Sequence, residues 1–409
     1  MRKFPIIMLT FTLLLAACVP AATTPATPLS PASVTNTPLL PECRLVNLKP
    51  TPGPEVPSLF PPISEDDHVL GPADASVTVL EYADFQCPTC AGLAPVLALL
   101  GIEYPQDFRL VFRHFPLLHR SDYDKTALAA QAAEAAAAQG KFWEMHDLLY
   151  GKQSEWKSLS PADFERWLYD QTALVGLDLA QFQADLNSAA IVTRVQQAWE
   201  DGLQTGLPYT PFLLINGQIY TGPIDYNSLK QIVSLIILGN RQVSTCPPMT
   251  VDPLKQYIAT LHTEKGDFVI QLYPDKAPLA VNSFVFLARN GWYDNITFHR
   301  VIPGFYIQTG DPSGTDAGGP GYFFVDEIDP SLHFDRPGVV AMFNTGADTN
   351  GSQFFITLVP APQMDGMYTI FGQVISGIEV LALLTPRDPM PGITLPPGDI
   401  LFSVTIEER

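Results

Sequence analysis

The residues best suited to chemistry are two cysteines separated by two residues, in Cys87-Pro88-Thr89-Cys90. Thiolate is the reactive form of cysteine, and two thiols at this spacing can exchange with another disulfide or form half of a metal site. The free amide N–H groups and the dipole at the start of a helix favour a thiolate. A helix that begins here would therefore lower the pKa of Cys87 and make it the attacking sulfur, while Cys90, one turn later, would resolve the mixed disulfide.

The surrounding sequence predicts the elements that would position this pair. Residues 77–82 form a β-branched run that predicts a strand, and apolar periodicity beginning at Cys87 predicts a helix. Phe212 to Ile215 predict a second strand, which Asn216-Gly217 turns into a hairpin. Between them, an Ala-rich run at 126–138 and Ser160-Pro161 at a helix start predict helices.

With these motifs, residues 64–240 resemble the DsbA-like branch of the thioredoxin superfamily. The resemblance implies an α/β thioredoxin fold with a helical insertion, and thiol-disulfide exchange. It makes Pro211 a cis-proline facing the sulfurs, Thr210 a substrate contact, and Glu81 a buried carboxyl that relays a proton to Cys90. From the residues alone, Glu81 is also compatible with a solvated edge strand, and Pro211 with a trans bond in a loop.

The dipeptide between the cysteines, Pro88-Thr89, departs from the most oxidising relatives, which have a histidine there. This dipeptide largely sets the redox potential of such a pair. Reductase or isomerase activity therefore stays open beside oxidase activity.

The pattern of elements restarts after Cys246 with many short strands and Gly and Pro turns, which predict an all-β barrel with few helices. Residues 256–273 predict two strands, and residues 278–290 a short helix. The motifs FHRVIPGFYIQTGDP at 298–312 and DTNGSQFFI at 348–356 closely resemble cyclophilin-type peptidyl-prolyl isomerases. The resemblance covers residues 255–408.

The isomerase reaction needs no covalent chemistry, because stabilising the twisted amide lowers a barrier of roughly 18–20 kcal/mol. The resemblance makes Arg300 the catalytic arginine, which donates to the prolyl nitrogen. It gives Gln308 a hydrogen bond to the substrate backbone. It assigns the apolar proline pocket and the neighbouring substrate contacts to Phe305, Tyr306, Phe343, Asn344, Phe355, Met364 and Tyr368.

The pocket rim departs from the family pattern. Gln363 replaces a common tryptophan, Met364 a leucine and Tyr368 a histidine. We therefore expect reduced or retuned turnover, and a peptide-holding chaperone with a weakly active barrel is the alternative.

Two further cysteines, Cys43 and Cys246, flank the first folded region. In an oxidising compartment we expect them to form a structural disulfide, with two free thiols or intermolecular pairing as alternatives. A four-cysteine zinc site would need a second close pair, and the seven histidines show no ligand spacing. We therefore expect neither a metal nor a cofactor.

The N-terminus predicts export. Residues 1–18 have two basic residues, an apolar run and the ending Leu15-Ala16-Ala17-Cys18, which resembles a bacterial lipobox with Cys18 as the acylated residue. An ordinary secretory signal is the alternative. Residues 19–63 hold 12 prolines up to Pro62 and predict an extended spacer. We expect an extracytoplasmic protein, lipid-anchored to a bacterial membrane.

Length and charge limit the architecture and the partners. A chain of 409 residues allows two or three domains. A net charge of −19 without any basic cluster argues against nucleic acid. We expect unfolded or folding exported polypeptides and a redox partner protein as partners. The predicted divisions are 1–18 signal peptide and lipobox, 19–63 linker, 64–246 thioredoxin domain and 253–409 isomerase domain.

Overall fold

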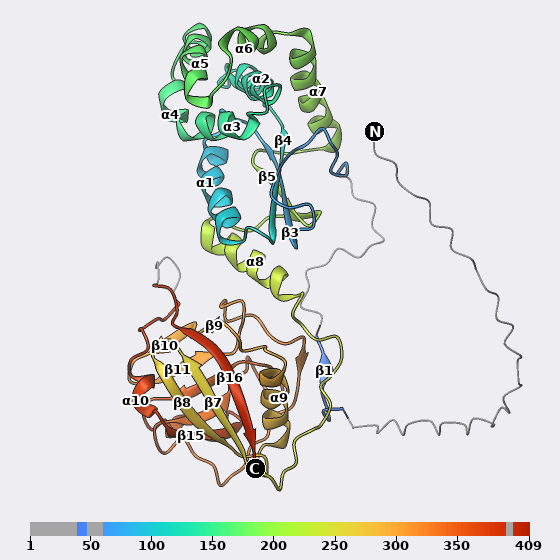
Figure 1. Cartoon of the computed structure of the whole chain (residues 1–409). Coiled ribbons are helices and arrows are strands. Elements are labelled where there is room, and N and C mark those ends of the chain that lie inside the picture. The colour runs from blue at the N-terminus through green and yellow to red at the C-terminus, as the bar shows by residue number, and fades with distance from the viewer. Residues whose placement is uncertain (1–38, 47–59, 390–395) are drawn as a thin grey trace, which may run out of the picture. The chain divides into compact units, whose positions relative to one another are not determined.

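The computed structural model describes residues 39–46, 60–389 and 396–409, which form two regions, each built on one large sheet (Figure 1). Cys18, the predicted signal and most of the predicted spacer lie outside the described residues. Among the described residues, no helix has the length and apolar character needed to span a membrane.

The first region, residues 60–238, is built on a five-stranded sheet of order β2-β4-β3-β5-β6. Only β3 and β4 pair in parallel. The predicted hairpin is confirmed: Asn216 and Gly217, between β5 and β6, both have positive φ, as a tight two-residue turn requires. The strands are β2 (His68–Leu70), β3 (Val77–Ala83), β4 (Phe108–His114), β5 (Phe212–Ile215) and β6 (Gln218–Tyr220).

Helices pack on this sheet and form a block inserted between β4 and β5 (Figure 1). Leu93, Leu97 and Leu100 of the first helix pack with Val77 and Val79 of β3, because they recur at helical spacing. The helices are α1 (Pro88–Glu103), α2 (Thr126–Ala137), α3 (Phe142–Gly151), α4 (Gln153–Trp156), α5 (Pro161–Val175), α6 (Leu179–Leu186), α7 (Ala189–Thr205) and α8 (Tyr226–Leu238). The predicted start of α5 is confirmed, since the Ser160 side chain accepts a hydrogen bond from the Asp163 amide.

The second region is a curled nine-stranded sheet of order β10-β11-β14-β13-β15-β8-β7-β16-β9 whose neighbouring strands all run antiparallel, consistent with the expected barrel. Its strands are β7 (Tyr257–Thr263), β8 (Gly266–Leu272), β9 (Ile296–Thr297), β10 (Arg300–Ile302), β11 (Tyr306–Thr309), β13 (Val339–Met342), β14 (Phe354–Thr357), β15 (Ile370–Ser376) and β16 (Ile400–Glu408). The helical segments of this region are α9 (Pro278–Arg289), η1 (Pro362–Met364) and α10 (Ile378–Leu381).

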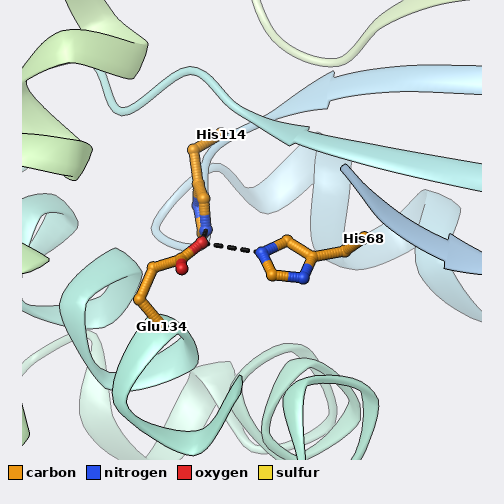
Figure 2. Close-up of side chains that lie close together, drawn as sticks. All are labelled: His68, His114 and Glu134. Atoms are coloured by element: carbon orange, nitrogen blue, oxygen red, sulfur yellow. Dashed lines mark hydrogen bonds and ion pairs between the residues drawn. The ribbon is translucent and has the colours of Figure 1, made fainter. Parts of the chain in front are cut away.

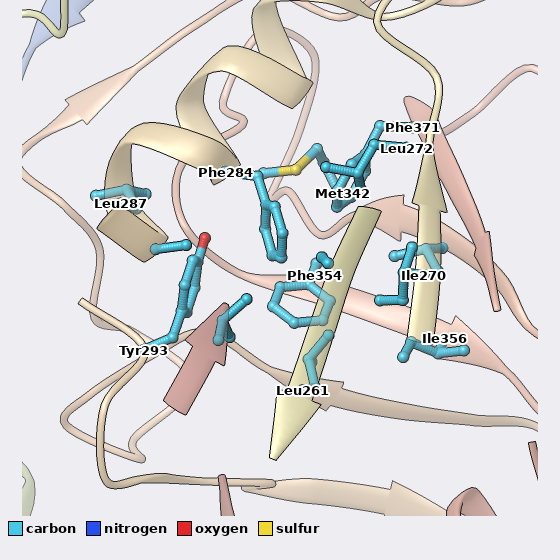
Figure 3. Packing of buried hydrophobic residues seen from close by; sticks show 14 of the residues in the cluster. Leu261, Ile270, Leu272, Phe284, Leu287, Tyr293, Met342, Phe354, Ile356 and Phe371 are labelled. Atoms are coloured by element: carbon cyan, nitrogen blue, oxygen red, sulfur yellow. The ribbon is translucent and has the colours of Figure 1, made fainter. Parts of the chain in front are cut away.

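Aromatic and aliphatic side chains together fill the core that packs against this second sheet (Figure 3). The Phe284 ring of α9 lies 5.2 Å from Tyr293 and 5.4 Å from both Phe354 and Phe371. The neighbouring strand positions alternate in direction, so residues such as Phe355 point to the opposite face of the sheet. The packed inner face therefore holds the outer face in a fixed arrangement.

A disulfide joins Cys43 to Cys246. Both flanking segments contact the second region: β1 (Arg44–Leu45) pairs with β12 (Tyr322–Phe323), and the Val243 amide bonds to Pro320. The sequence predicts a disulfide that joins the end of the spacer to the end of the first domain, and it predicts extended spacer at residues 39–46. The structure differs because Leu40 and Cys43 pack into the apolar core of the second region.

Candidate active sites

The first candidate site lies at the start of α1. Cys87 is the residue that precedes the helix, with extended backbone, and Pro88 occupies the first turn. The Gln153 side chain donates hydrogen bonds to the carbonyls of Phe85 and Cys87 at 2.8 and 3.0 Å and so holds the loop before the helix. Cys87 is 4% exposed and lies next to the exposed Pro88 and Thr89. Gln153 was not predicted, because its role depends on the inserted helices.

The two thiols differ in acidity. A hydrogen bond from Cys90 is the largest cause that lowers the pKa of Cys87 to about 5; burial opposes it, and the amides of Cys90 and Thr89 add to it. Burial raises the pKa of Cys90 well above its ordinary value. Near neutral pH the negative charge of the reduced pair therefore sits on Cys87.

Thr210 and Pro211 lie beside this sulfur. The Thr210–Pro211 peptide bond is cis. The Cys87 Sγ atom is 3.5 Å from the Thr210 carbonyl oxygen. The structure thus brings together Cys87, Cys90 and the two loop residues named from the sequence.

Glu81 lies on β3, the central strand of its sheet, and is 1% exposed. The interpretation as a solvated edge-strand residue is therefore wrong. Neither carboxyl oxygen has a hydrogen-bond partner among the described residues. Burial, with the charge of Cys87 as a second cause, raises the pKa of Glu81 to about 8, so this carboxyl holds its proton at neutral pH.

The second candidate site is a row of side chains across three adjacent strands. Arg300 of β10 is directly opposite Gln308 of β11, which is directly opposite Phe355 of β14. Directly paired residues project from the same face of a sheet, so these three side chains are neighbours on one face. The sheet register alone therefore positions them.

The apolar residues predicted for the proline pocket gather beside this row. The Tyr306 ring lies 4.8 Å from Phe305 and 5.6 Å from Phe355, and Phe355 lies 5.1 Å from Tyr368. Phe355 and Met364 are buried members of one apolar cluster, against which Phe305, Tyr306, Phe343 and Tyr368 pack half-buried.

A carboxylate that sequence reasoning missed lies within this site. Asp316 Oδ2 is 3.3 Å from Nη1 of Arg300, and its Oδ1 accepts a 2.6 Å hydrogen bond from Gln308. Burial would raise the pKa of Asp316, but His299, Arg300 and Gln308 outweigh it and hold that pKa below its ordinary value. A second carboxylate, Asp388, lies 3.1 Å from Arg300 Nε. The guanidinium of Arg300, the predicted catalytic arginine, is therefore paired with two carboxylates.

Asn344 and Phe343 line a small pocket of about 90 Å³ that Asp316 also lines. The Asn344 amide nitrogen donates to Asp326 at 3.1 Å. The Gln308 side chain is fully buried, and its Oε1 atom has no hydrogen-bond partner among the described residues. This atom is therefore a buried acceptor without a partner among the described residues, and a ligand could reach it only if neighbouring side chains moved.

Comparison with known proteins agrees with this division of the chain. A family model described as "Cyclophilin type peptidyl-prolyl cis-trans isomerase/CLD" matches residues 258–388, and one described as "Thioredoxin" matches residues 64–234. A thioredoxin-like domain and a cyclophilin-type isomerase domain therefore lie in one chain.

Curated relatives match the isomerase part. Peptidyl-prolyl cis-trans isomerase-like 1 of Aspergillus fumigatus is 50% identical over 122 residues, which are 29% of this chain and 76% of that protein. Peptidyl-prolyl cis-trans isomerase A of Mycobacterium tuberculosis is 47% identical over 148 residues, covering 32% of this chain and 81% of that protein. The chain belongs to the cyclophilin family, and these matches support prolyl isomerase activity; the thioredoxin match suggests thiol redox chemistry.

The match to larger relatives is partial. The chain spans 24% of the mouse peptidylprolyl isomerase domain and WD repeat-containing protein 1, with 43% identity over 153 residues and 36% of this chain covered.

The solved cyclophilin type peptidyl-prolyl cis-trans isomerase of Cryptosporidium parvum is 38% identical, with a TM-score of 0.35, and the match covers 37% of this chain and 98% of that one.

Proposed function

We propose that this chain is an extracytoplasmic protein-folding catalyst that combines thiol-disulfide exchange at Cys87 and Cys90 with isomerisation of X–Pro bonds at Arg300. The observation that carries the proposal is the coexistence of two centres of different chemistry. One is a low-pKa sulfur at a helix start. The other is the Arg300, Gln308 and Phe355 row beside an apolar cluster. Disulfide formation and prolyl isomerisation are both slow steps in folding.

In the oxidising direction, a client thiolate attacks Sγ of Cys87 in the Cys87–Cys90 disulfide, and Cys90 leaves as a thiolate. Glu81, which holds its proton up to a pH of about 8, gives that proton to Cys90. A second client thiolate then attacks the client sulfur, so the client disulfide forms and Cys87 leaves as a stable thiolate. A redox partner protein would take the two electrons and restore the disulfide.

In the isomerase, the proline ring of the client rests on Phe355, Phe305 and their neighbours. Arg300 donates to the prolyl nitrogen as the amide twists and that nitrogen regains its lone pair. The Oε1 atom of Gln308, which is buried without a partner among the described residues, accepts a backbone N–H of the client once the client displaces the side chains that cover it. Phe343 and Asn344 line the small pocket for the residue that precedes proline.

Location and anchoring belong to the same proposal. The lipobox-like ending at Cys18 supports acylation of that cysteine and attachment to a bacterial membrane. The Cys43–Cys246 disulfide supports an oxidising compartment, in which disulfides persist. The clients would then be exported polypeptides that are still folding.

Two variants test the dual function. A reduced, unfolded client with two cysteines and a native cis-proline is refolded with the full chain and oxidised glutathione. Cys87→Ser should abolish accelerated disulfide formation and leave proline-limited refolding accelerated, whereas Arg300→Ala should do the reverse. The proposal fails if either variant keeps the activity assigned to its residue.

A second candidate, a peptide-holding chaperone with weak turnover, is favoured by one observation. Asp316 and Asp388 both pair with Arg300 and compete with a substrate for its N–H groups. A protease-coupled assay on a proline peptide separates the candidates, because a holding protein binds the peptide without increasing its isomerisation rate.

A further inference from the structure

Two histidines and a glutamate converge from three elements of the first region (Figure 2). His68 comes from β2, His114 from the end of β4 and Glu134 from α2. The Nε2 atoms of His68 and His114 lie 2.7 and 2.9 Å from the same atom, Oε1 of Glu134. One ligand atom from each residue lies within 4.8 Å of the other two. Neither the thiol centre nor the Arg300 centre uses this cluster.

We propose that His68, His114 and Glu134 form a binding site for a divalent transition metal ion, with Zn²⁺ the ion that suits them best. Two imidazole nitrogens and one carboxylate oxygen are a set that zinc accepts when three side chains bind it and a fourth position is left to water. The hard ions Ca²⁺ and Mg²⁺ prefer sites made of oxygen atoms, so they fit this set less well.

The two contacts to Glu134 need only a small adjustment, and the two imidazole nitrogens, which lie within 4.8 Å of each other, would have to come to about 3.3–3.4 Å. Tetrahedral zinc with bonds of about 2.0–2.1 Å places its ligand atoms about 3.3–3.4 Å apart. The two N–O separations of 2.7 and 2.9 Å would therefore widen by about 0.5 Å. Each neutral imidazole would carry its proton on Nδ1 and offer the Nε2 lone pair to the ion. The ion then takes the place of the two protons shared with Glu134.

The surroundings hold the ligand atoms in place. The Phe142 ring stacks on His68 with ring centroids 3.4 Å apart. Arg194 Nε contacts the other carboxylate oxygen, Oε2 of Glu134, at 3.1 Å, which leaves Oε1 directed at the imidazoles. The Arg194 side chain is 45% exposed, so water screens its repulsion of a cation.

Access to the site is from the side of His68. The His68 side chain is 14% exposed, against 6% for His114 and 3% for Glu134. A bound ion would connect the paired strands β2 and β4 of the sheet to helix α2, which lies in a different layer. Because the ion binds only the folded arrangement, it should raise the unfolding temperature.

The test uses the full chain carrying Cys87→Ser and Cys90→Ser, so that thiols of the pair bind no metal. Titration calorimetry with ZnCl2 measures affinity, Co²⁺ absorption reports tetrahedral nitrogen and oxygen ligation, and thermal unfolding reports stabilisation. His68→Ala is the main variant, because His68 lies on an edge strand; Glu134→Gln keeps the side-chain shape. His333→Ala is the matched control, since His333 faces a carboxylate, Asp365, at 3.0 Å.

We expect the parent and His333→Ala to bind one zinc equivalent and to show visible Co²⁺ bands. Their unfolding temperature should rise by roughly 5–10 °C when zinc exceeds its dissociation constant about 100-fold. His68→Ala and Glu134→Gln should bind at least about tenfold more weakly. The proposal is overturned if the parent binds no zinc at millimolar concentration, or if folded His68→Ala binds it as tightly as the parent. The three residues would then be a hydrogen-bonded network only.

Discussion

The low pKa of Cys87 leads to a sharp prediction about how its reactivity depends on pH. In the folded chain this pKa is about 5, against an ordinary value of 9.0. At pH 5 about half of Cys87 is therefore thiolate, whereas a thiol of ordinary pKa is about 0.01% thiolate, a difference of about 5000-fold. A thiolate of lower pKa is also less nucleophilic, by about 40- to 100-fold for four pKa units. Alkylation at pH 5 should still be about 50- to 125-fold faster than in the unfolded chain.

The assay is alkylation by iodoacetamide from pH 3 to 10, followed at the Cys87 peptide by mass spectrometry. The rate for the folded, reduced chain should reach half its maximum near pH 5 and stay level above about pH 7. Because the Cys90 hydrogen bond is the largest cause of the shift, Cys90→Ala should move the midpoint upward, while Cys90→Ser keeps a donor and should move it less. A midpoint above pH 7 in the unaltered chain would refute the assignment of Cys87 as the stabilised thiolate.

Three further changes have defined outcomes. Because the folded-state pKa of Glu81 is about 8 and its ordinary value is 4.5, Glu81 makes a contribution to stability that is lost as pH rises from 4.5 to 8, so the reduced Glu81→Gln chain should gain stability relative to the unaltered reduced chain over that range in urea unfolding. Asp316→Gly should raise isomerase kcat/KM several-fold by freeing Arg300, and Asp316→Asn, which removes only the charge, should give part of that gain; an unchanged rate in both would mean that the carboxylate does not compete with substrate. Phe284→Ala should destabilise the second region by about 3–5 kcal/mol in denaturant unfolding, since a buried ring among three others leaves a cavity.

Local sequence signals predicted local structure well. Asn216-Gly217 predicted a two-residue turn, and Ser160-Pro161 a capped helix start, because each depends on the backbone preferences of a few adjacent residues. The position of Glu81 was undecided from sequence, since a strand becomes central only when its partners are known. Pairing with β4 on one side and β5 on the other makes β3 interior.

The charge partners of the reactive groups were the part that sequence did not predict. Asp316 lies 16 residues beyond Arg300, in a loop where it has a left-handed φ of 69°, and it contacts Arg300 from there. Glu134 is 66 residues from His68 and 20 from His114, so no ligand spacing marks the cluster. Such contacts depend on tertiary packing, which a motif of a few residues does not encode.

In both centres, the neighbours of the reactive group decide what it can do. At the thiol centre, Glu81 and Cys90 keep their protons near neutral pH, so Cys87 carries the only negative charge of the three. At the isomerase centre, the guanidinium of Arg300 is always charged, but two carboxylates share its N–H groups. The first arrangement leaves the Cys87 sulfur as a reactive thiolate. The second leaves the N–H groups of Arg300 paired with carboxylates until a substrate displaces one of them. Under the proposed function, the same chain would be a reactive thiol catalyst and a restrained isomerase, a contrast set by Glu81, Cys90, Asp316 and Asp388, of which only Cys90 belongs to a sequence motif.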